Sequence, residues 1–143
     1  MNGNINLKNF KQVALDTNIF IYHFHEYPKL TDLADVIFVN LADNKLKAVT
    51  SLITLIELLS FKTPEPAINE LKNAFYSTPN LSVLTIEQDI AMEAARIRRV
   101  YGFRLPDSIQ LATALIGKAQ AFVTNDQQLK KFHQLPIVLL NSQ

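Results

Sequence analysis

The stretch Gln12-Val13-Ala14-Leu15-Asp16-Thr17-Asn18 decides how this chain folds. Its first part, Gln12 to Leu15, is a short apolar run that predicts a buried strand. Its second part, Asp16-Thr17-Asn18, has the turn and N-cap chemistry that starts a helix. A buried strand that leads directly into a helix is typical of proteins that alternate the two elements.

The same alternation continues along the chain. Further short strands are predicted at Lys45–Val49, Leu81–Leu84, Ala121–Thr124 and Ile137–Leu140. The helices are predicted after Asp16 and over Leu30–Leu41, Leu52–Phe61, Ala67–Tyr76, Thr85 or Glu87 to Tyr101, Leu105–Gly117 and Gln127–His133. The strands are apolar throughout rather than alternating, which predicts an α/β protein with a parallel sheet buried on both faces.

Length and composition exclude several classes of protein. The 143 residues fit one domain, and 48% hydrophobic with 19% charged residues is typical of a globular chain. The absence of cysteine excludes disulfides, thiolate nucleophiles and Cys-zinc sites. No GxGxxG or P-loop motif occurs. The polar N-terminal lead, residues 1–11, has no apolar signal core, so we expect a cytoplasmic protein. The lead is either an expression remnant or a small partner-binding arm.

The near-zero net charge hides an uneven distribution. Residues 1–95 carry seven Lys against eleven acids, whereas residues 96–143 carry four Arg and three Lys against two acids. A basic patch of this kind suits contacts with phosphate groups, although a solvated helix end is an equal interpretation. The candidate contacts with a phosphate backbone are Arg96, Arg98, Arg99, Arg104 and Lys118.

Four acidic residues occupy positions where a charge is costly. Asp16 follows the first strand, Asp126 follows the fourth, and Asp107 opens a helix after Pro106. Glu57 lies in the apolar run Leu52–Leu59, and no Lys or Arg lies three or four residues away, so it needs a distant partner. Since a buried carboxylate needs a partner, a proton or a metal, one shared Mg²⁺ or Mn²⁺ ion is the simplest explanation.

The predicted topology brings these acids together. Ligands of open parallel sheets bind beyond the carboxyl ends of the strands, where Asp16 and Asp126 fall and where the helix that starts near Asp107 begins. Each acid also has a purely structural interpretation. Asp16 and Asp126 suit N-caps, and Asp107 suits a helix N-terminus. Glu57 is the hardest of the four to explain in this way.

Four segments together resemble the motifs of PIN-domain ribonucleases. They occur in the family's order over nearly the whole chain, and the size of the chain resembles the VapC-like toxins of bacterial toxin–antitoxin pairs. The segments are Leu15-Asp16-Thr17-Asn18-Ile19-Phe20-Ile21-Tyr22, Thr50-Ser51-Leu52-Ile53-Thr54-Leu55-Ile56-Glu57-Leu58, Leu105-Pro106-Asp107-Ser108-Ile109-Gln110-Leu111-Ala112-Thr113-Ala114 and Val123-Thr124-Asn125-Asp126-Gln127-Gln128-Leu129.

The resemblance implies a three-layer α/β/α PIN-like fold, with about five parallel strands in the order 3-2-1-4-5 and one domain over residues 1–143. It implies Mg²⁺- or Mn²⁺-dependent cleavage of RNA through metal-activated water, with one-metal and two-metal schemes both open. The implied metal-binding and catalytic residues are Asp16, Glu57, Asp107 and Asp126, with Thr17, Asn18 and Thr124 as supporting polar residues.

The resemblance also implies partners. Toxin-like members form homodimers and are silenced by an antitoxin whose tail enters the acidic cleft. The stripe Ile19, Phe20, Tyr22, Phe24 with Tyr27 is either an apolar groove for a partner helix or ordinary core. We favour core for Ile19 and Phe20.

Two other functions remain open from the sequence. The first is a non-catalytic PIN-like module that binds RNA or protein, against which the complete set of four acids argues. The second is a phosphatase-like enzyme with Asp16 as nucleophile. Such enzymes usually have a second Asp two residues on, where this chain has Asn18. The three histidines are expected on the surface or in packing rather than in catalysis.

Overall fold

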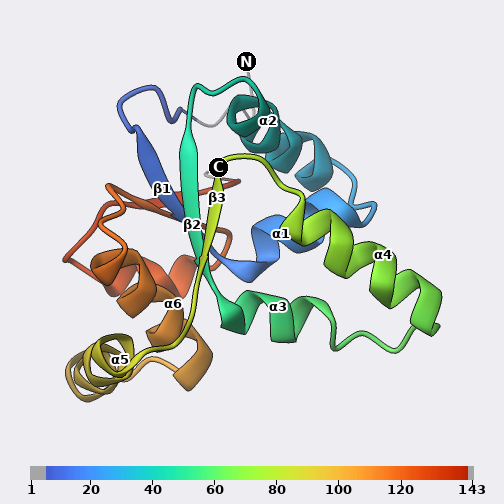
Figure 1. Ribbon diagram of the computed structural model, residues 1–143. Helices are drawn as coiled ribbons and strands as arrows, with labels where there is room; N and C mark the ends of the chain where they lie inside the picture. The colour runs from blue at the N-terminus through green and yellow to red at the C-terminus, as the bar shows by residue number, and fades with distance from the viewer. Residues whose placement is uncertain (1–5, 142–143) are drawn as a thin grey trace.

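The computed structural model describes residues 6–141, and it contains five strands in one parallel sheet (Figure 1). The order β3-β2-β1-β4-β5 confirms the predicted 3-2-1-4-5 arrangement. The strands are β1 Gln12–Leu15, β2 Lys47–Ser51, β3 Leu81–Leu84, β4 Phe122–Thr124 and β5 Ile137–Leu139. The second strand runs two residues past its predicted end, to Ser51, whose hydroxyl also caps the next helix.

Six α-helices and one 3-10 helix connect the strands within residues 6–141. They are α1 Thr17–Phe24, α2 Leu30–Ala42, α3 Leu52–Leu58, α4 Glu65–Tyr76, α5 Gln88–Tyr101, α6 Leu105–Ile116 and the 3-10 helix η1 Gln127–Lys131. The prediction that α3 reaches Phe61 is wrong by three residues. The chain leaves the helix at Leu59, whose backbone N–H still donates to the Leu55 carbonyl, and a short connection then leads to Pro64, the N-cap of α4.

Helices cover both faces of the sheet, which confirms the three-layer α/β/α fold (Figure 1). Successive residues of β1 point to opposite faces. Val13 and Leu15 pack in a core with α1, α2 and α4, whereas Ala14 packs in a second core with α5, α6 and η1. The central strands β1 and β4 are buried on both faces and are largely apolar, whereas the edge strands β3 and β5 are only partly buried.

The predicted N-terminal lead is described only from Asn6 onward, and its residues 1–5 lie outside the described residues. Leu7 is buried and Phe10 packs against the core of the α1 and α2 layer. The described part of the lead is therefore tied to the domain by two apolar side chains. Within residues 6–141, none of the helices is long and apolar enough to cross a membrane.

Candidate active site

Asp16 lies at the carboxyl end of β1 and caps helix α1. Its Oδ1 accepts a hydrogen bond from the Thr17 backbone N–H at 2.8 Å, and its Oδ2 accepts one from the Thr124 hydroxyl at 2.7 Å. The residue is only 7% exposed. The pKa of its carboxyl is raised from 3.8 to about 7, chiefly by burial and to a lesser degree by the charges of Asp107 and Glu57, while the two hydrogen bonds oppose the shift.

Glu57 finds the distant partner that its sequence context requires. It is partly buried near the end of α3, and its Oε1 accepts a hydrogen bond from the Thr17 hydroxyl at 2.5 Å. Thr17 therefore contacts Glu57 with its side chain while its backbone N–H holds Asp16. One residue at the start of α1 thus orients two of the four predicted acids.

Asp107 lies in the first turn of α6 and pairs with Arg104. The Arg104 Nε is 3.3 Å from Asp107 Oδ2, and the two side chains are 77% and 13% exposed. The hydrogen bond to Asp107 and that residue's charge raise the pKa of the Arg104 guanidinium, and the charges of Asp126 and Glu57 act in the same direction. Arg104 therefore lies within electrostatic reach of three of the predicted acids.

Asp126 caps the short helix η1 and is linked to Asp16 through Thr124. Its Oδ1 accepts from the Gln128 backbone N–H at 3.0 Å, and its own backbone N–H donates to the Thr124 hydroxyl oxygen at 3.1 Å. That same hydroxyl donates to Asp16. The capping interpretations of Asp16 and Asp126 are therefore correct, and both caps leave these acids at the carboxyl edge of the sheet.

The oxygens gathered at this edge suit a hard divalent cation. The charges of Glu57 and Asp107 both act on the carboxyl of Asp16. Nearby, the Asn18 Oδ1 is buried without a hydrogen-bond partner in the described part of the chain, while its Nδ2 donates to Thr124 at 3.4 Å. An unsatisfied buried oxygen beside buried carboxylates is the environment that a cation with oxygen ligands would stabilise.

The acids do not form a closed cage as they stand. Within residues 6–141, no three His, Asp or Glu side chains lie close enough together to hold one ion. Mg²⁺ keeps several waters and is usually bound directly by only one or two carboxylates, so it does not require three converging acids. The donor set therefore fits a cation held partly through water.

The predicted basic residues do not all lie beside the acids. Arg104 does, through Asp107. Arg98 and Arg99 are exposed in the last turn of α5, and Arg96 is held by Glu93 and Gln134. Lys118 follows the end of α6, where its carbonyl lies 3.5 Å from the Gln12 side-chain nitrogen at the start of β1. Lys118 is thus at the opposite edge of the sheet from Asp16.

The three histidines lie in packing contacts or on the surface, as predicted. His23 stacks on Phe38 with ring centres 3.8 Å apart and binds Asp35 at 2.7 Å. His25 packs edge-on against Phe61, and His133 is exposed.

Three buried polar residues beneath the acids were missed as site residues. Gln110, Thr50 and Thr54 are each at most 2% exposed and are hydrogen-bonded to one another or to Thr17. Gln110 has the same signal in the sequence as Glu57, a polar side chain inside an apolar helix. Applying that criterion to uncharged residues as well would have found it.

Fold and site together define an α/β/α protein in which the buried Asp16 and further carboxylates that act on it lie at the carboxyl edge of a parallel sheet. The sequence model of the PIN domain family matches residues 13–135, and the chain therefore belongs to that family. No curated protein matches the sequence closely enough to compare.

Solved structures from toxin–antitoxin complexes share this fold. A toxin–antitoxin complex from Klebsiella pneumoniae matches with 26% identity and a TM-score of 0.66, over 90% of this chain and 97% of that chain. VapBC2 from Rickettsia felis, bound to a DNA fragment from its promoter, matches with 21% identity and a TM-score of 0.71, over 88% of this chain and 96% of that chain. DNA-bound VapBC from Salmonella typhimurium matches with 21% identity and a TM-score of 0.70, over 90% and 98%.

Proposed function

We propose that this PIN domain is a Mg²⁺- or Mn²⁺-dependent endoribonuclease and the toxin of a toxin–antitoxin pair. One observation carries the proposal: Asp16 is a buried carboxyl whose pKa is raised to about 7 beside two further acids, at the edge where parallel sheets bind ligands. A purely structural N-cap does not need to be buried among like charges. Membership of the PIN family and the likeness to toxin–antitoxin complexes support the same function.

Asp16, Glu57, Asp107 and Asp126 are the proposed metal ligands, some of them through water. A bound Mg²⁺ or Mn²⁺ would neutralise charge on the phosphoryl oxygens and lower the pKa of a bound water. Thr124 and the Thr17 backbone hold Asp16 in one orientation, and the Thr17 hydroxyl holds Glu57. A carboxylate held in this way can orient the attacking water or accept its proton.

Arg104 is the basic residue best placed to meet the substrate. It is 77% exposed beside Asp107, so its guanidinium can reach a phosphate without leaving the site. Arg96, Arg98, Arg99 and Lys118 are proposed to follow the RNA backbone farther away, where they would supply affinity and salt dependence rather than sequence choice.

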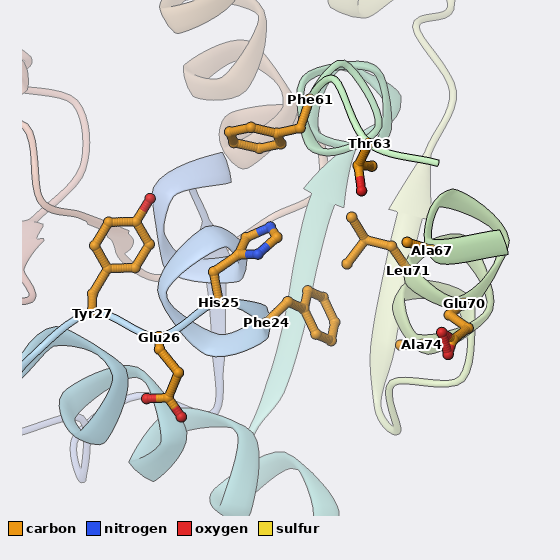
Figure 2. A pocket seen from close by; sticks show the side chains of 10 residues that line it. All are labelled: Phe24, His25, Glu26, Tyr27, Phe61, Thr63, Ala67, Glu70, Leu71 and Ala74. Carbon is orange, nitrogen blue, oxygen red and sulfur yellow. The ribbon is translucent and has the colours of Figure 1, made fainter. Parts of the chain in front are cut away.

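An apolar groove supports the proposed antitoxin partner. It has a volume of about 650 Å³ and lies between the end of α1, the segment after α3 and helix α4. Figure 2 shows Phe24 and Leu71 facing each other across the groove and Tyr27 at its rim. Phe24 and Tyr27 belong to the predicted apolar stripe, whereas Ile19 and Phe20 are fully buried core residues, as we favoured. The apolar face of an amphipathic helix suits such a groove.

The rest of the proposed biology follows from the family resemblance. We propose that residues 1–143 form one PIN domain, that two copies pair as a homodimer, and that the protein acts on RNA in the cytoplasm. A non-catalytic PIN-like binding module is the alternative function, and the retention of all four acids counts against it.

Incubation of the purified chain with end-labelled total RNA tests the proposal. Discrete fragments should form with Mg²⁺ or Mn²⁺ and should be lost with EDTA and with Asp16→Asn. Asp43→Asn is the matched control, because Asp43 is an exposed acid beyond the end of α2 and makes no contact with the site. Cleavage that survives Asp16→Asn would show that the activity does not come from this site but from a contaminant. A folded wild type that cleaves no RNA with either metal would reject the nuclease and favour the binding module.

A further inference from the structure

Gln110 is a buried amide in the middle of helix α6, between Ile109 and Leu111. It is 2% exposed, and its Nε2 lies 3.0 Å from the Thr17 hydroxyl oxygen and 2.8 Å from the Thr54 hydroxyl oxygen. A buried amide is costly unless its protons are used. Both Nε2 protons are used here, and both go to side-chain hydroxyls.

The direction of each hydrogen bond beneath the site can be worked out by counting protons. The Thr50 hydroxyl lies 2.9 Å from the Leu15 carbonyl, which can only accept, so Thr50 donates its single proton there. The 2.7 Å contact between Thr50 and Thr54 must therefore use the proton of Thr54. The Thr54 oxygen is then left to accept a proton from Gln110.

The same count fixes the hydroxyl of Thr17. Its oxygen accepts the second amide proton of Gln110, which leaves its own proton to donate. Two acceptors are in reach, the Glu57 carboxylate oxygen at 2.5 Å and the Thr54 oxygen at 3.3 Å. A carboxylate is the stronger acceptor, and here it is also the closer one, so the Thr17 proton points to Glu57.

The opposite orientation of the Gln110 amide fails the same count. Turning the amide over would present its oxygen to Thr17 and Thr54, and each would then have to donate to it. The proton of Thr54 is already committed to Thr50. Thr17 would have to turn its proton away from Glu57, and the carboxylate would lose its hydrogen bond.

We infer that Gln110 is a positioning residue of the active site, whose two amide protons make Thr17 donate to Glu57 and so hold that carboxylate in place. Its chain of hydrogen bonds runs from α6 through α1 to α3. Within residues 6–141, no hydrogen bond joins Gln110 directly to one of the four predicted acids. This inference rests on the proposed function for the role of Glu57. The geometry that it asserts can be tested without RNA.

The kinetic test compares Gln110→Met, which keeps the length and removes both protons, with the wild type. We expect kcat for RNA cleavage to fall about tenfold, with KM changed less than twofold, because Glu57 loses orientation while the RNA contacts remain. In a Thr17→Val background, Gln110→Met should lower kcat little further, because the hydroxyl through which Gln110 acts is already absent. Additive losses in kcat would overturn the inference, since they would show that Gln110 acts by another route.

Thr113→Val is the matched control for a lost buried hydrogen bond in the same helix. Thr113 is 1% exposed, and its hydroxyl donates only to the Ile109 carbonyl at 2.8 Å, away from the acids. This variant should lose thermal stability to a similar degree as Gln110→Met but keep kcat. An equal loss of kcat in Thr113→Val would attribute the effect of Gln110→Met to general destabilisation and would overturn the inference.

NMR of the metal-free protein separates this inference from the proposed function. The Glu57 side-chain carboxyl ¹³C resonance should shift in Gln110→Met and should shift in the same direction in Thr17→Val, with no shift in Thr113→Val. An unchanged Glu57 resonance in folded Gln110→Met would overturn the inference whether or not RNA is cleaved. If the wild type cleaves no RNA but the two variants show these shifts, the nuclease is rejected and the positioning of Glu57 by Gln110 still stands.

Discussion

At the scale of single residues, Asp16 combines a structural and a chemical role. It caps α1 and accepts from Thr124, and it is buried deeply enough to hold a proton near neutral pH in the absence of a cation. A capped, buried carboxyl whose charge is disfavoured gains most when a cation binds to it. The stability of the metal-free protein and its affinity for metal are therefore coupled through this one group.

The first prediction concerns stability against pH. The folded-state pKa of Asp16 is about 7 against 3.8 for the free group, so the folded chain keeps a proton that the unfolded chain releases. The contribution of Asp16 to the free energy of unfolding should therefore fall as pH rises from about 4 to about 7. In EDTA at pH 8, Asp16→Asn should be more stable than the wild type by about 1–3 kcal/mol, measured by urea unfolding.

The control for this prediction is the same comparison at pH 4, where the wild-type carboxyl is protonated in the folded chain. The gain from Asp16→Asn should largely disappear there. A gain of equal size at both pH values would mean that it comes from packing or hydrogen bonding and not from the buried charge.

The second prediction concerns Arg104, whose guanidinium is a resident positive charge beside the acids. Removing it with Arg104→Gln should raise the affinity for Mn²⁺, because the positive charge of Arg104 no longer competes with the cation for Asp107. Arg104 is largely exposed and its charge is screened by solvent, so the gain should be about two- to fivefold, measured by calorimetric titration at low salt. The same variant should weaken RNA binding. Weaker Mn²⁺ binding in Arg104→Gln would contradict this account.

At the scale of elements, helix ends were predicted best where one residue fixes them. Gly102 ends α5 with φ of 75°, and Asp16 begins α1 with a side-chain cap. The ends that were missed lie where no single residue decides. Helix α3 stops at Leu58 although the apolar run continues to Leu59. Leu59 and Ser60 already lie outside the helix, in the segment that leads to Pro64. Helix η1 is a short 3-10 segment, a form that periodicity does not separate from a short α-helix.

The third prediction tests the end of α5, which delivers Arg104 and α6 to the site. Gly102 has left-handed backbone, and a Cβ placed on it would meet no atom within 4 Å, so only the backbone conformation opposes a side chain there. Gly102→Ala should lower the free energy of unfolding by about 1 kcal/mol, and Gly102→Asn should cost less, because Asn tolerates this conformation. Thermal or urea unfolding checks both variants. Equal costs for Ala and Asn would argue against a conformational origin.

At the scale of the whole molecule, the sheet order and the layers follow from short apolar strands that alternate with helices. The positions of Asp16, Asp107 and Asp126 relative to the strands likewise follow from topology, whereas Glu57 lies about two turns into its helix and its contact with Thr17 appears only in the folded chain. Periodicity does not reveal the network of Gln110, Thr54, Thr50 and Thr17, because it joins residues up to 93 positions apart that meet only in the folded chain. The same topology also implies that Lys118 lies at the opposite edge of the sheet from Asp16, because it follows the far end of the helix that starts near Asp107. The basic-patch interpretation overlooked this implication.

The central claim is that the carboxyl edge of the sheet binds a divalent cation through Asp16. The most direct test is a Mn²⁺ titration at pH 8 followed by electron paramagnetic resonance, in which the signal of free Mn²⁺ disappears on binding. The wild type and the Asp43→Asn control should bind Mn²⁺, and Asp16→Asn should bind it at least tenfold more weakly. Mn²⁺ binding of equal strength in Asp16→Asn, or none in the folded wild type, would contradict the claim.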